Sequence, residues 1–360
     1  MNGLDRTVKV LFLTVIAQSC FFCVRAQEER KDKTAVTFEE LYDEPSSVNK
    51  LFIGFQPFYG ELFATNPNAG YGLEASYYYK DKLDFKANFR KTYSSSFYDL
   101  NRNLASLDAG PGITTKPQIF NYYELGGTYH FKDAEQDGKT TLVLYKGTYK
   151  GNRWASRVPL HAEVPCKVRK IYGARLGTIL WSSTADLDRA LKHQGLTNSN
   201  LVNAENVGLP TTYVDASGTT RNFDVFGNIH SVSVYAGASI TWIRNLAVSF
   251  DKFEEAVDDG IFTLFFDLQY APALKLDPIN YSNPNTPTIN ESYSTKPINM
   301  IPLGFRAGLD GKFNRTFSWG YGGEIGYRPS IKGETFYAMF KISFPLYGTN
   351  LDYKVESFGK

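Results

Sequence analysis

Hydrophobic and polar residues alternate strictly in three segments between residues 300 and 347. Their apolar positions are Leu303, Phe305, Ala307 and Leu309, then Trp319, Tyr321, Ile325 and Tyr327, then Phe336, Ala338, Phe340, Ile342 and Phe344. A period of two predicts β-strands, because successive side chains of a strand leave opposite faces. The runs last about nine to twelve residues, as a tilted strand needs to cross a bilayer. Ordinary strands are roughly five to six residues long.

The same alternation predicts seven further strands, over residues 51–59, 70–80, 83–90, 120–131, 168–181, 229–242 and 260–270. The apolar face is rich in aromatic residues, and the polar face mixes glycine with charges of both signs. This is the repeat of an antiparallel up-and-down transmembrane β-barrel. An even count of ten places both termini on one side, the periplasm. Two alternatives stay open: a soluble sandwich with long strands, and a twelve-stranded barrel that uses residues 139–164 as two more strands.

The connections between the predicted strands differ in length on the two sides. Residues 60–69, 94–118, 182–228, 272–299 and 329–333 fall on one side, which we expect to be extracellular because long loops lie there in such barrels. The long loops are 182–228 and 272–299, and 184–193 is a helix candidate capped by Thr184. The other side receives Asp81, a hairpin near 133–167 that begins with a charged turn over 132–138, residues 243–259, and 311–315. We expect the hairpin to protrude into the periplasm.

The N-terminal residues resemble a cleaved secretory signal. Arg6 and Lys9 precede an apolar run over 10–24, and small Ala26 stands before Gln27. We therefore expect 1–26 to be removed, with a lipoprotein signal ending at Cys20 as the alternative. Residues 27–48 predict a mobile periplasmic arm with a short helix over 38–42. The barrel then occupies 49–347, and 348–360 form a C-terminal tail.

Charge and cysteine content exclude some functions. The whole chain has 39 basic and 37 acidic residues; the expected signal carries three basic residues and one acidic, so the mature chain has 36 of each. A nucleic-acid partner is not expected, because such binding needs a concentrated basic patch. Cys20 and Cys23 leave with the signal, so Cys166 is alone and an internal disulfide is excluded.

Charged residues of the inward parity indicate what fills the lumen. Six acids face six bases, and we predict that they form a lumen charge network: Glu74, Asp84, Lys86, Arg90, Glu124, Arg175, Asp267, Arg306, Asp310, Glu324, Arg328 and Lys341. Eight strands leave an interior just filled by side chains, so ten strands should be nearly filled. Buried charges must pair. A salt-bridged, largely closed lumen is one interpretation, and a narrow polar pathway or small-solute site is the other.

Aromatic residues of the outward parity predict a lipid-facing girdle, since such rings mark the membrane interfaces of barrels. Its expected members are Tyr77, Tyr79, Phe85, Phe89, Trp319, Tyr321, Tyr327, Phe336, Phe340 and Phe344. Outer-membrane lipid is thus the first expected partner, and other outer-membrane proteins are the second.

Catalytic motifs do not stand out in the sequence. A rim enzyme could use one of the four histidines His130, His161, His193 and His230 as a general base. None lies in a hydrolase or metal-binding motif, and the glycine clusters near 304–308 and 320–323 lie within strands rather than before helices. We therefore expect no catalytic site, no cofactor and no metal.

The mature chain resembles the outer-membrane β-barrel proteins of Bacteroidetes-type Gram-negative bacteria. The resemblance rests on the site between Ala26 and Gln27 and on the terminal hairpin over 317–344. It implies an integral outer-membrane protein and transfers no catalytic residue. One departure is that such barrels usually end on an aromatic residue, whereas a polar tail here follows Tyr347. The expected function is a structural or interaction component of an outer-membrane assembly, with a narrow channel or transporter and a rim enzyme as alternatives.

Overall fold

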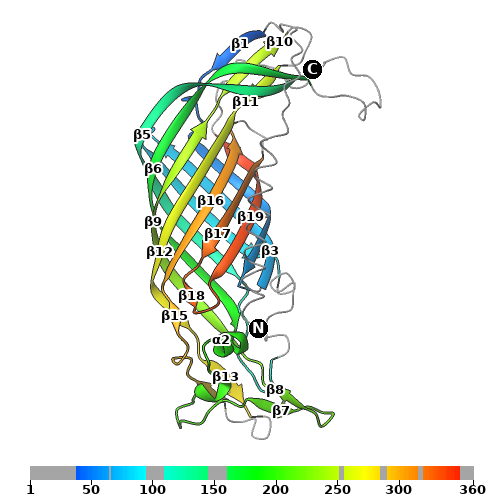
Figure 1. Ribbon diagram of the computed structural model, residues 1–360. Coiled ribbons are helices and arrows are strands. Elements are labelled where there is room, and N and C mark those ends of the chain that lie inside the picture. Colours follow the sequence, from blue (N-terminus) through cyan, green and yellow to red (C-terminus); the bar gives the residue numbers. More distant parts are fainter. Residues whose placement is uncertain are drawn as a thin grey trace, which may run out of the picture. The chain divides into compact units, whose positions relative to one another are not determined.

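The computed structural model describes residues 38–64, 66–94, 109–144, 160–250, 255–283, 290–314 and 319–348. Within them, ten antiparallel strands form one closed barrel (Figure 1). Each strand pairs with its neighbour in chain order, and the last pairs with the first. The strands are β2 (Leu51–Phe63), β3 (Asn66–Tyr79), β4 (Leu83–Thr92), β5 (Asn121–Leu144), β6 (Leu160–Asp186), β9 (Phe226–Ile243), β12 (Gly260–Leu276), β16 (Leu303–Phe313), β17 (Gly320–Tyr327) and β19 (Phe336–Gly348). This confirms the ten-stranded up-and-down barrel; the sandwich and the twelve-stranded barrel are wrong.

The two faces of the wall differ in chemistry. Arg306 lies opposite Asp267 on one side and Gly326 on the other, and all three share the inward face. Large apolar side chains project outward from all ten strands; among those exposed by more than half are Leu125, Phe131, Leu176, Leu268, Leu303, Ile325 and Phe340. The period of two therefore becomes an ionic interior and an apolar exterior, as the sequence pattern requires.

Several strand ends differ from the sequence prediction. Residues 60–69, predicted as a loop, are almost all strand, because β2 continues to Phe63 and β3 begins at Asn66. Residues 132–138, predicted as a charged turn, lie inside β5, and β12 runs on to Leu276. The physical reason is that a strand ladder is made by backbone groups. Glycine, asparagine and charged side chains can therefore stay in it where the pairing partner continues.

β5 and β6 extend past the barrel wall as a two-stranded hairpin. β4 pairs with β5 only as far as Tyr129, and β9 pairs with β6 only as far as Arg169, whereas β5 and β6 stay paired to Leu144 and Leu160. Beside the hairpin is a sheet of β1 (Phe38–Asp43), β10 (Leu246–Phe250) and β11 (Ala256–Asp258) (Figure 1). Apolar side chains of both parts form one cluster: Leu142, Leu144, Val164, Cys166, Leu246, Val248, Phe250 and Ala256.

Residues 38–42 form strand β1 rather than the predicted short helix, because β1 is hydrogen-bonded beside β10. Residues 44–50 then lead to the barrel. Asn245 Nδ2, just past β9, donates to the carbonyls of Glu44 and Ser47, and Asn314 Nδ2, just past β16, also donates to Ser47. The expected signal (1–26), the first part of the arm (27–37) and most of the tail (349–360) lie outside the described residues.

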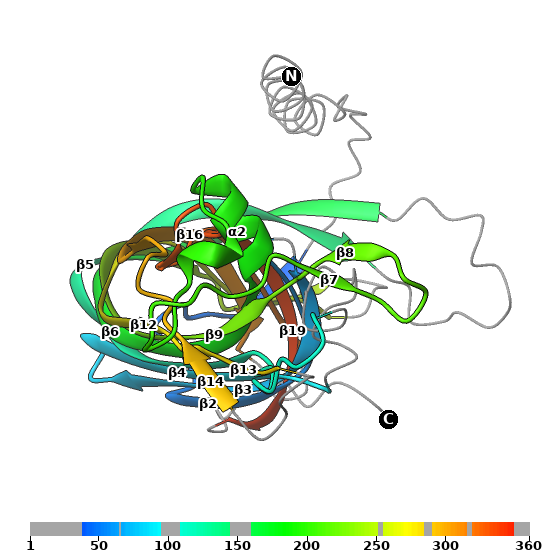
Figure 2. The same cartoon turned by 90° about the horizontal axis from the view of Figure 1, so that it is seen from below.

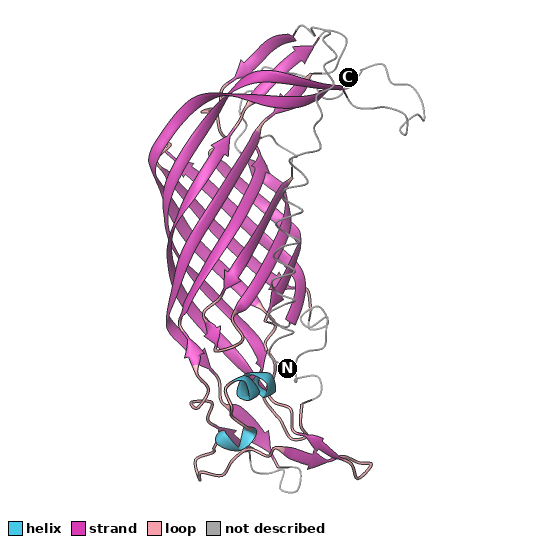
Figure 3. Ribbon diagram, in the orientation of Figure 1, coloured by secondary structure: helices cyan, strands magenta, loops and turns pink. Residues whose placement is uncertain are grey.

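The opposite end, called the loop end, carries short elements on the long connections. They are α2 (Leu187–His193), the 3₁₀ turn η3 (Asn198–Asn200), and the paired strands β7 (Thr212–Val214) with β8 (Thr220–Asn222), β13 (Ile279–Ser282) with β14 (Asn290–Tyr293), and β15 (Met300–Ile301) with β18 (Ser330–Ile331). Figure 2 shows α2, β13 and β14 at this opening, and Figure 3 shows how little helix the described chain contains. In the described residues, no helix is long and apolar enough to cross a membrane.

The helix starts later than predicted. Its N-cap is Asp186, whose carboxylate accepts from the Arg189 N–H, and not Thr184. Thr184 is still part of β6 and pairs with Asn228 on β9. Its hydroxyl is hydrogen-bonded to Asn228 Oδ1 at 2.8 Å and to the Gln118 carbonyl at 2.9 Å. Thr184 could cap a helix by its side chain, but its hydroxyl is instead used to join β6 to Asn228 and Gln118.

Candidate functional site

The lumen is the candidate site, and all twelve charged residues predicted for it lie on inward-facing positions. They separate into three groups along the barrel. A central cluster contains Arg90, Glu124, Arg175, Asp267, Arg306 and Glu324. A cluster toward the hairpin contains Glu74, Asp84, Lys86, Asp310 and Lys341. Arg328 lies toward the loop end.

Arg306 is the centre of the central cluster. Its Nε donates to Asp267 at 2.8 Å, Nη2 donates to Glu124 at 2.5 Å, and Nη1 lies 3.6 Å from Glu324. Arg175 holds Asp267 through two nitrogens, at 2.9 and 3.2 Å, and Arg90 holds Glu324 at 2.9 Å. Three arginines thus balance three carboxylates. The Arg306 side chain is 1% exposed and that of Asp267 is 0% exposed, so this cluster fills the middle of the lumen.

Neutral side chains complete the central cluster. Asn88 Nδ2 and the Tyr122 hydroxyl both donate to Glu124 Oε2 at 3.0 Å, and the Arg306 guanidinium lies 4.5 Å from the Tyr235 ring centroid. Sequence reasoning missed these three residues because it counted only charges. Their inward parity was the available signal. Asn88 lies two positions from Arg90, Tyr122 lies two positions from Glu124, and Tyr235 stands between the outward Val234 and Ala236.

At the loop end, Arg328 forms a buried ion pair with Glu61. Arg328 Nη1 and Nη2 reach the two carboxylate oxygens at 3.2 and 2.8 Å. Five rings surround the guanidinium carbon at 4.3–5.8 Å, from Phe63, Phe120, Tyr122, Trp181 and Tyr337. Glu61 was missed because 60–69 was interpreted as a loop. A bulge between Gln56 and Tyr59 places Glu61 on the inward face.

Beyond this pair, an apolar cluster covers the loop end of the lumen, and we call it the loop cap. Wall residues such as Tyr59, Phe63, Trp181 and Tyr337 pack with residues of the connections, among them Leu187, Leu191, Leu201, Leu209, Phe223, Ile279 and Ile331. All are buried. The helix, the 3₁₀ turn and the β-ribbons therefore pack into the barrel mouth rather than leaving it open to water.

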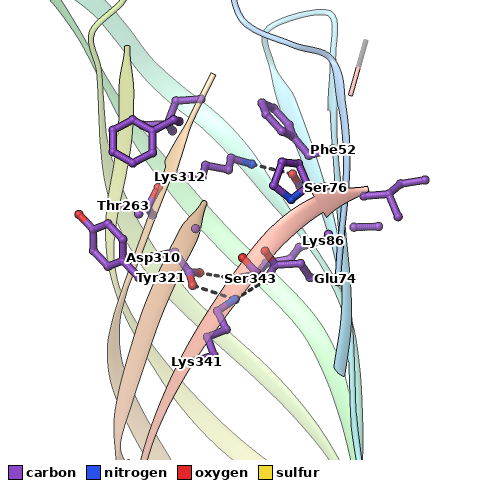
Figure 4. A pocket seen from close by; sticks show the side chains of 18 of the residues that line it. Phe52, Glu74, Ser76, Lys86, Thr263, Asp310, Lys312, Tyr321, Lys341 and Ser343 are labelled. Carbon is purple, nitrogen blue, oxygen red and sulfur yellow. Dashed lines mark hydrogen bonds and ion pairs between the residues drawn. The ribbon is translucent and has the colours of Figure 1, made fainter. Parts of the chain in front are cut away.

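The hairpin end of the lumen contains a cavity of about 90 Å³ whose lining includes several charged side chains (Figure 4). Lys341 bridges Glu74 at 2.5 Å and Asp310 at 3.2 Å, and Lys86 also pairs with Asp310. Lys312, missed because 311–315 was interpreted as a turn, donates to Ser76 at 2.7 Å. At the same end, Val48 and Phe52 pack against Ile171, Ile243 and Ile261, which narrows the exit.

The aromatic residues predicted for the girdle lie on outward-facing positions. Tyr77, Tyr79, Phe85, Trp319, Tyr321, Tyr327, Phe336, Phe340 and Phe344 are exposed, and Phe89 is half-buried. Phe89 is covered because its ring contacts Tyr123 at a centroid distance of 5.2 Å and Tyr71 at 6.3 Å.

The four histidines occur on different elements. His130 lies on β5 with Nδ1 2.9 Å from the Asp81 carbonyl, and His230 on β9 lies 3.0 Å from Asp277. His161 is on the hairpin, and His193 ends α2. In the part of the chain that the structure describes, no group of three or more His, Cys, Asp or Glu residues is arranged to hold a metal ion. The structure does not bring these histidines together into one site.

Comparisons with known proteins give only distant likenesses. No family model and no curated protein matches the sequence. Among solved structures, the chain is similar to the CymD monoaromatic hydrocarbon channel, with 8% identity, 84% of this chain and 88% of that chain covered, and a TM-score of 0.20. Pseudomonas putida OprB is 10% identical, with 78% of this chain and 60% of that chain covered and a TM-score of 0.16. A loop-deletion mutant of OmpT, an outer membrane protein of Vibrio cholerae, is 9% identical, with 83% of this chain and 100% of that chain covered and a TM-score of 0.17. Overlaps this low carry no argument, so the fold rests on the strand pairing itself.

Proposed function

We propose that this chain is an integral outer-membrane β-barrel with a closed lumen that acts as a structural or interaction component of a membrane assembly. The exterior supports the membrane placement, because apolar side chains project outward from all ten strands. Burying such a surface in lipid is favourable, and a closed barrel satisfies its backbone hydrogen bonds within the wall. The hairpin end then faces the periplasm, and the loop cap faces the extracellular side of the membrane.

The observation that carries the proposal is the buried ion cluster around Arg306. Paired charges with almost no exposed surface occupy the middle of the lumen, and the loop cap covers one end. A water-filled channel needs a continuous polar path, as in porins with many more strands. The surfaces left for function are the outer wall, the hairpin with its adjoining sheet, and the outer side of the loop cap.

Planar-bilayer recording tests this proposal. Purified protein refolded into a bilayer should show no steady conductance, whereas a regular open channel would contradict a closed lumen. Pull-down from native membranes in mild detergent, followed by identification of co-eluting chains, tests the assembly role. Recovery of the chain without stoichiometric partners would count against it.

A narrow pathway or binding site for small polar solutes is the second candidate. The cavity of about 90 Å³ at the hairpin end favours it, because its walls carry three lysines, Arg175 and three carboxylates. Liposome-swelling assays with graded solutes measure such a pathway. Under this alternative, replacing Arg306 or Glu324 changes solute selectivity, whereas a closed lumen predicts lost stability instead.

A further inference from the structure

The cavity at the hairpin end combines a charged interior with an apolar rim. Its interior side chains include Ser76, Asp84 and Lys312, and the rim includes Ile53, Trp319 and Tyr321. The rim residues belong to the outer face of the wall, where Trp319 is 47% exposed. The cavity therefore reaches from the lumen to the outer face of the barrel.

The strand registers explain why the cavity reaches the outer face here. β17 is the shortest barrel strand, and its pairing with β16 and β19 ends at Gly320. β16 continues beside β12 to Phe313, and β19 continues beside β2 to Gly348. Phe313, Trp319 and Pro345, at this end of the three strands, all line the cavity.

Of the seven charged residues that line this cavity, Lys312 and Asp84 form no ion pair among the described residues. Lys86 and Lys341 neutralise Glu74 and Asp310. Lys312 donates only to the Ser76 hydroxyl, and its ammonium lies 4.1 Å from the Phe52 ring centroid and 5.2 Å from that of Tyr78. Asp84 has its Oδ1 shielded from solvent with no hydrogen-bond partner in the described structure.

Both groups have hydrogen-bonding capacity that a guest in the cavity would use. A shielded carboxylate oxygen without a donor favours a cationic partner, and the ammonium of the part-buried Lys312 favours an anionic acceptor. Lys312 and Asp84 both line the cavity. The cavity therefore presents one cationic and one anionic partner to a guest.

We infer that this cavity binds a zwitterion that carries a phosphate and an ammonium group, with the phosphate at Lys312 and the ammonium at Asp84. A volume of about 90 Å³ admits a small head group and excludes a bulky one. The apolar rim suits acyl chains that continue along the outer wall, so a zwitterionic phospholipid supplies this chemistry in a bilayer. Free phosphoethanolamine supplies the same groups in solution. The lipid source rests on the proposed membrane placement; the recognition chemistry does not.

Calorimetric titration of the full chain in detergent, with soluble probes, tests the recognition chemistry. Phosphoethanolamine should bind at least about tenfold more tightly than inorganic phosphate or ethanolamine, because it uses both charged partners. Lys312→Met should weaken phosphoethanolamine and phosphate binding and leave ethanolamine binding unchanged. Asp84→Asn should weaken phosphoethanolamine and ethanolamine binding and leave phosphate binding unchanged. Lys332→Met and Asp188→Asn, both exposed on the loop end, are matched controls that should change none of these.

The wild-type titration decides the inference even if a variant does not fold, which heat-dependent gel migration would reveal. Equal affinities for phosphoethanolamine and inorganic phosphate, or no binding of any probe, would overturn it. Native mass spectrometry from nanodiscs then distinguishes the source: retained phosphatidylethanolamine in preference to phosphatidylglycerol supports the lipid, and soluble binding without lipid retention supports a free zwitterion. The closed-lumen proposal is tested by conductance, so a failed titration would not contradict it.

Discussion

Arg306 on β16 donates to Glu124 on β5 at 2.5 Å, across the lumen and between strands that are not neighbours in the barrel. The two residues are 182 positions apart in the chain. Each side chain is only 1% exposed, so water does not solvate either charge if its partner is removed. This contact therefore ties opposite walls together and makes the interior sensitive to the loss of either partner.

Replacing Arg306 should destabilise the barrel strongly. Arg306→Met leaves Glu124 and Asp267 without their shared partner, and breaking a buried pair typically costs about 3–5 kcal/mol. Urea unfolding of the refolded protein in lipid vesicles measures this change. Adding Glu124→Gln in the same chain should recover part of the loss. Lys275→Met, at a lysine that is 72% exposed, is the control, and a loss no larger than in the control would contradict the central role of Arg306.

The aromatic surroundings of Arg328 make a charge-conserving substitution costly. Arg328→Lys keeps the charge and loses the two-nitrogen contact with Glu61 and the planar stacking against the rings. We expect a loss of about 1–3 kcal/mol, the scale of a hydrogen bond to a charged group. The same unfolding assay measures it, with Arg221→Lys on the exposed β7–β8 ribbon as the control. Unchanged stability would show that the charge alone suffices.

The proposed membrane placement predicts a penalty for a charge on the outer wall. Leu125 projects outward from the barrel part of β5 and is 64% exposed. Leu125→Arg should reduce folding stability in vesicles by about 2–4 kcal/mol, the cost of arginine on the lipid face near the bilayer midplane. Val214→Arg, at an equally exposed valine on β7, should cost almost nothing. Equal tolerance at both positions would place the Leu125 face in water.

Packing of the loop cap should weaken as pH rises through neutrality. Glu334 packs beside α2, with one oxygen 3.2 Å from Arg189 Nε. Burial raises the pKa of Glu334 to about 7, against the lowering effect of Arg189, while Asp186 adds to the rise. The folded state then holds a proton that the unfolded state releases near its ordinary pKa. This contribution is present in full below that ordinary pKa and is lost as pH rises through about 7.

Hydrogen exchange of the α2 amides, corrected for intrinsic rates, measures this effect. Exchange should become faster between pH 5 and pH 8 in the wild type. Glu334→Gln should remove the part of that dependence centred near pH 7 and leave a part near pH 6, because burial also raises the pKa of Asp186, the α2 N-cap, to about 6. Glu205→Gln, on an exposed loop residue, should leave the dependence as in the wild type. A Glu334→Gln profile parallel to that of the wild type would assign the dependence to another group.

Local sequence patterns did not predict secondary structure correctly where backbone pairing or long-range contacts decide it. Gly60 and Ala69 look like loop residues, yet they face each other in the ladder between β2 and β3. Glu61 follows Gly60 and was missed for that reason. Phe38 to Tyr42 have helix-compatible side chains, but the sheet edge offered by β10 is available only once the chain has folded. In each case the deciding partner lies beyond the window in which propensity acts.

By itself, the sequence determined the all-β class and the ten-stranded barrel, because the period of two is written into residue types and assigns each side chain to one face. Only the tertiary structure decided which charges meet. Arg306 finds Glu124 and Arg328 finds Glu61 because closure of the barrel brings distant strands across one narrow lumen. The same closure placed Lys312 and Asp84 around one cavity, because β16 and β4, which carry them, are not neighbours in the barrel.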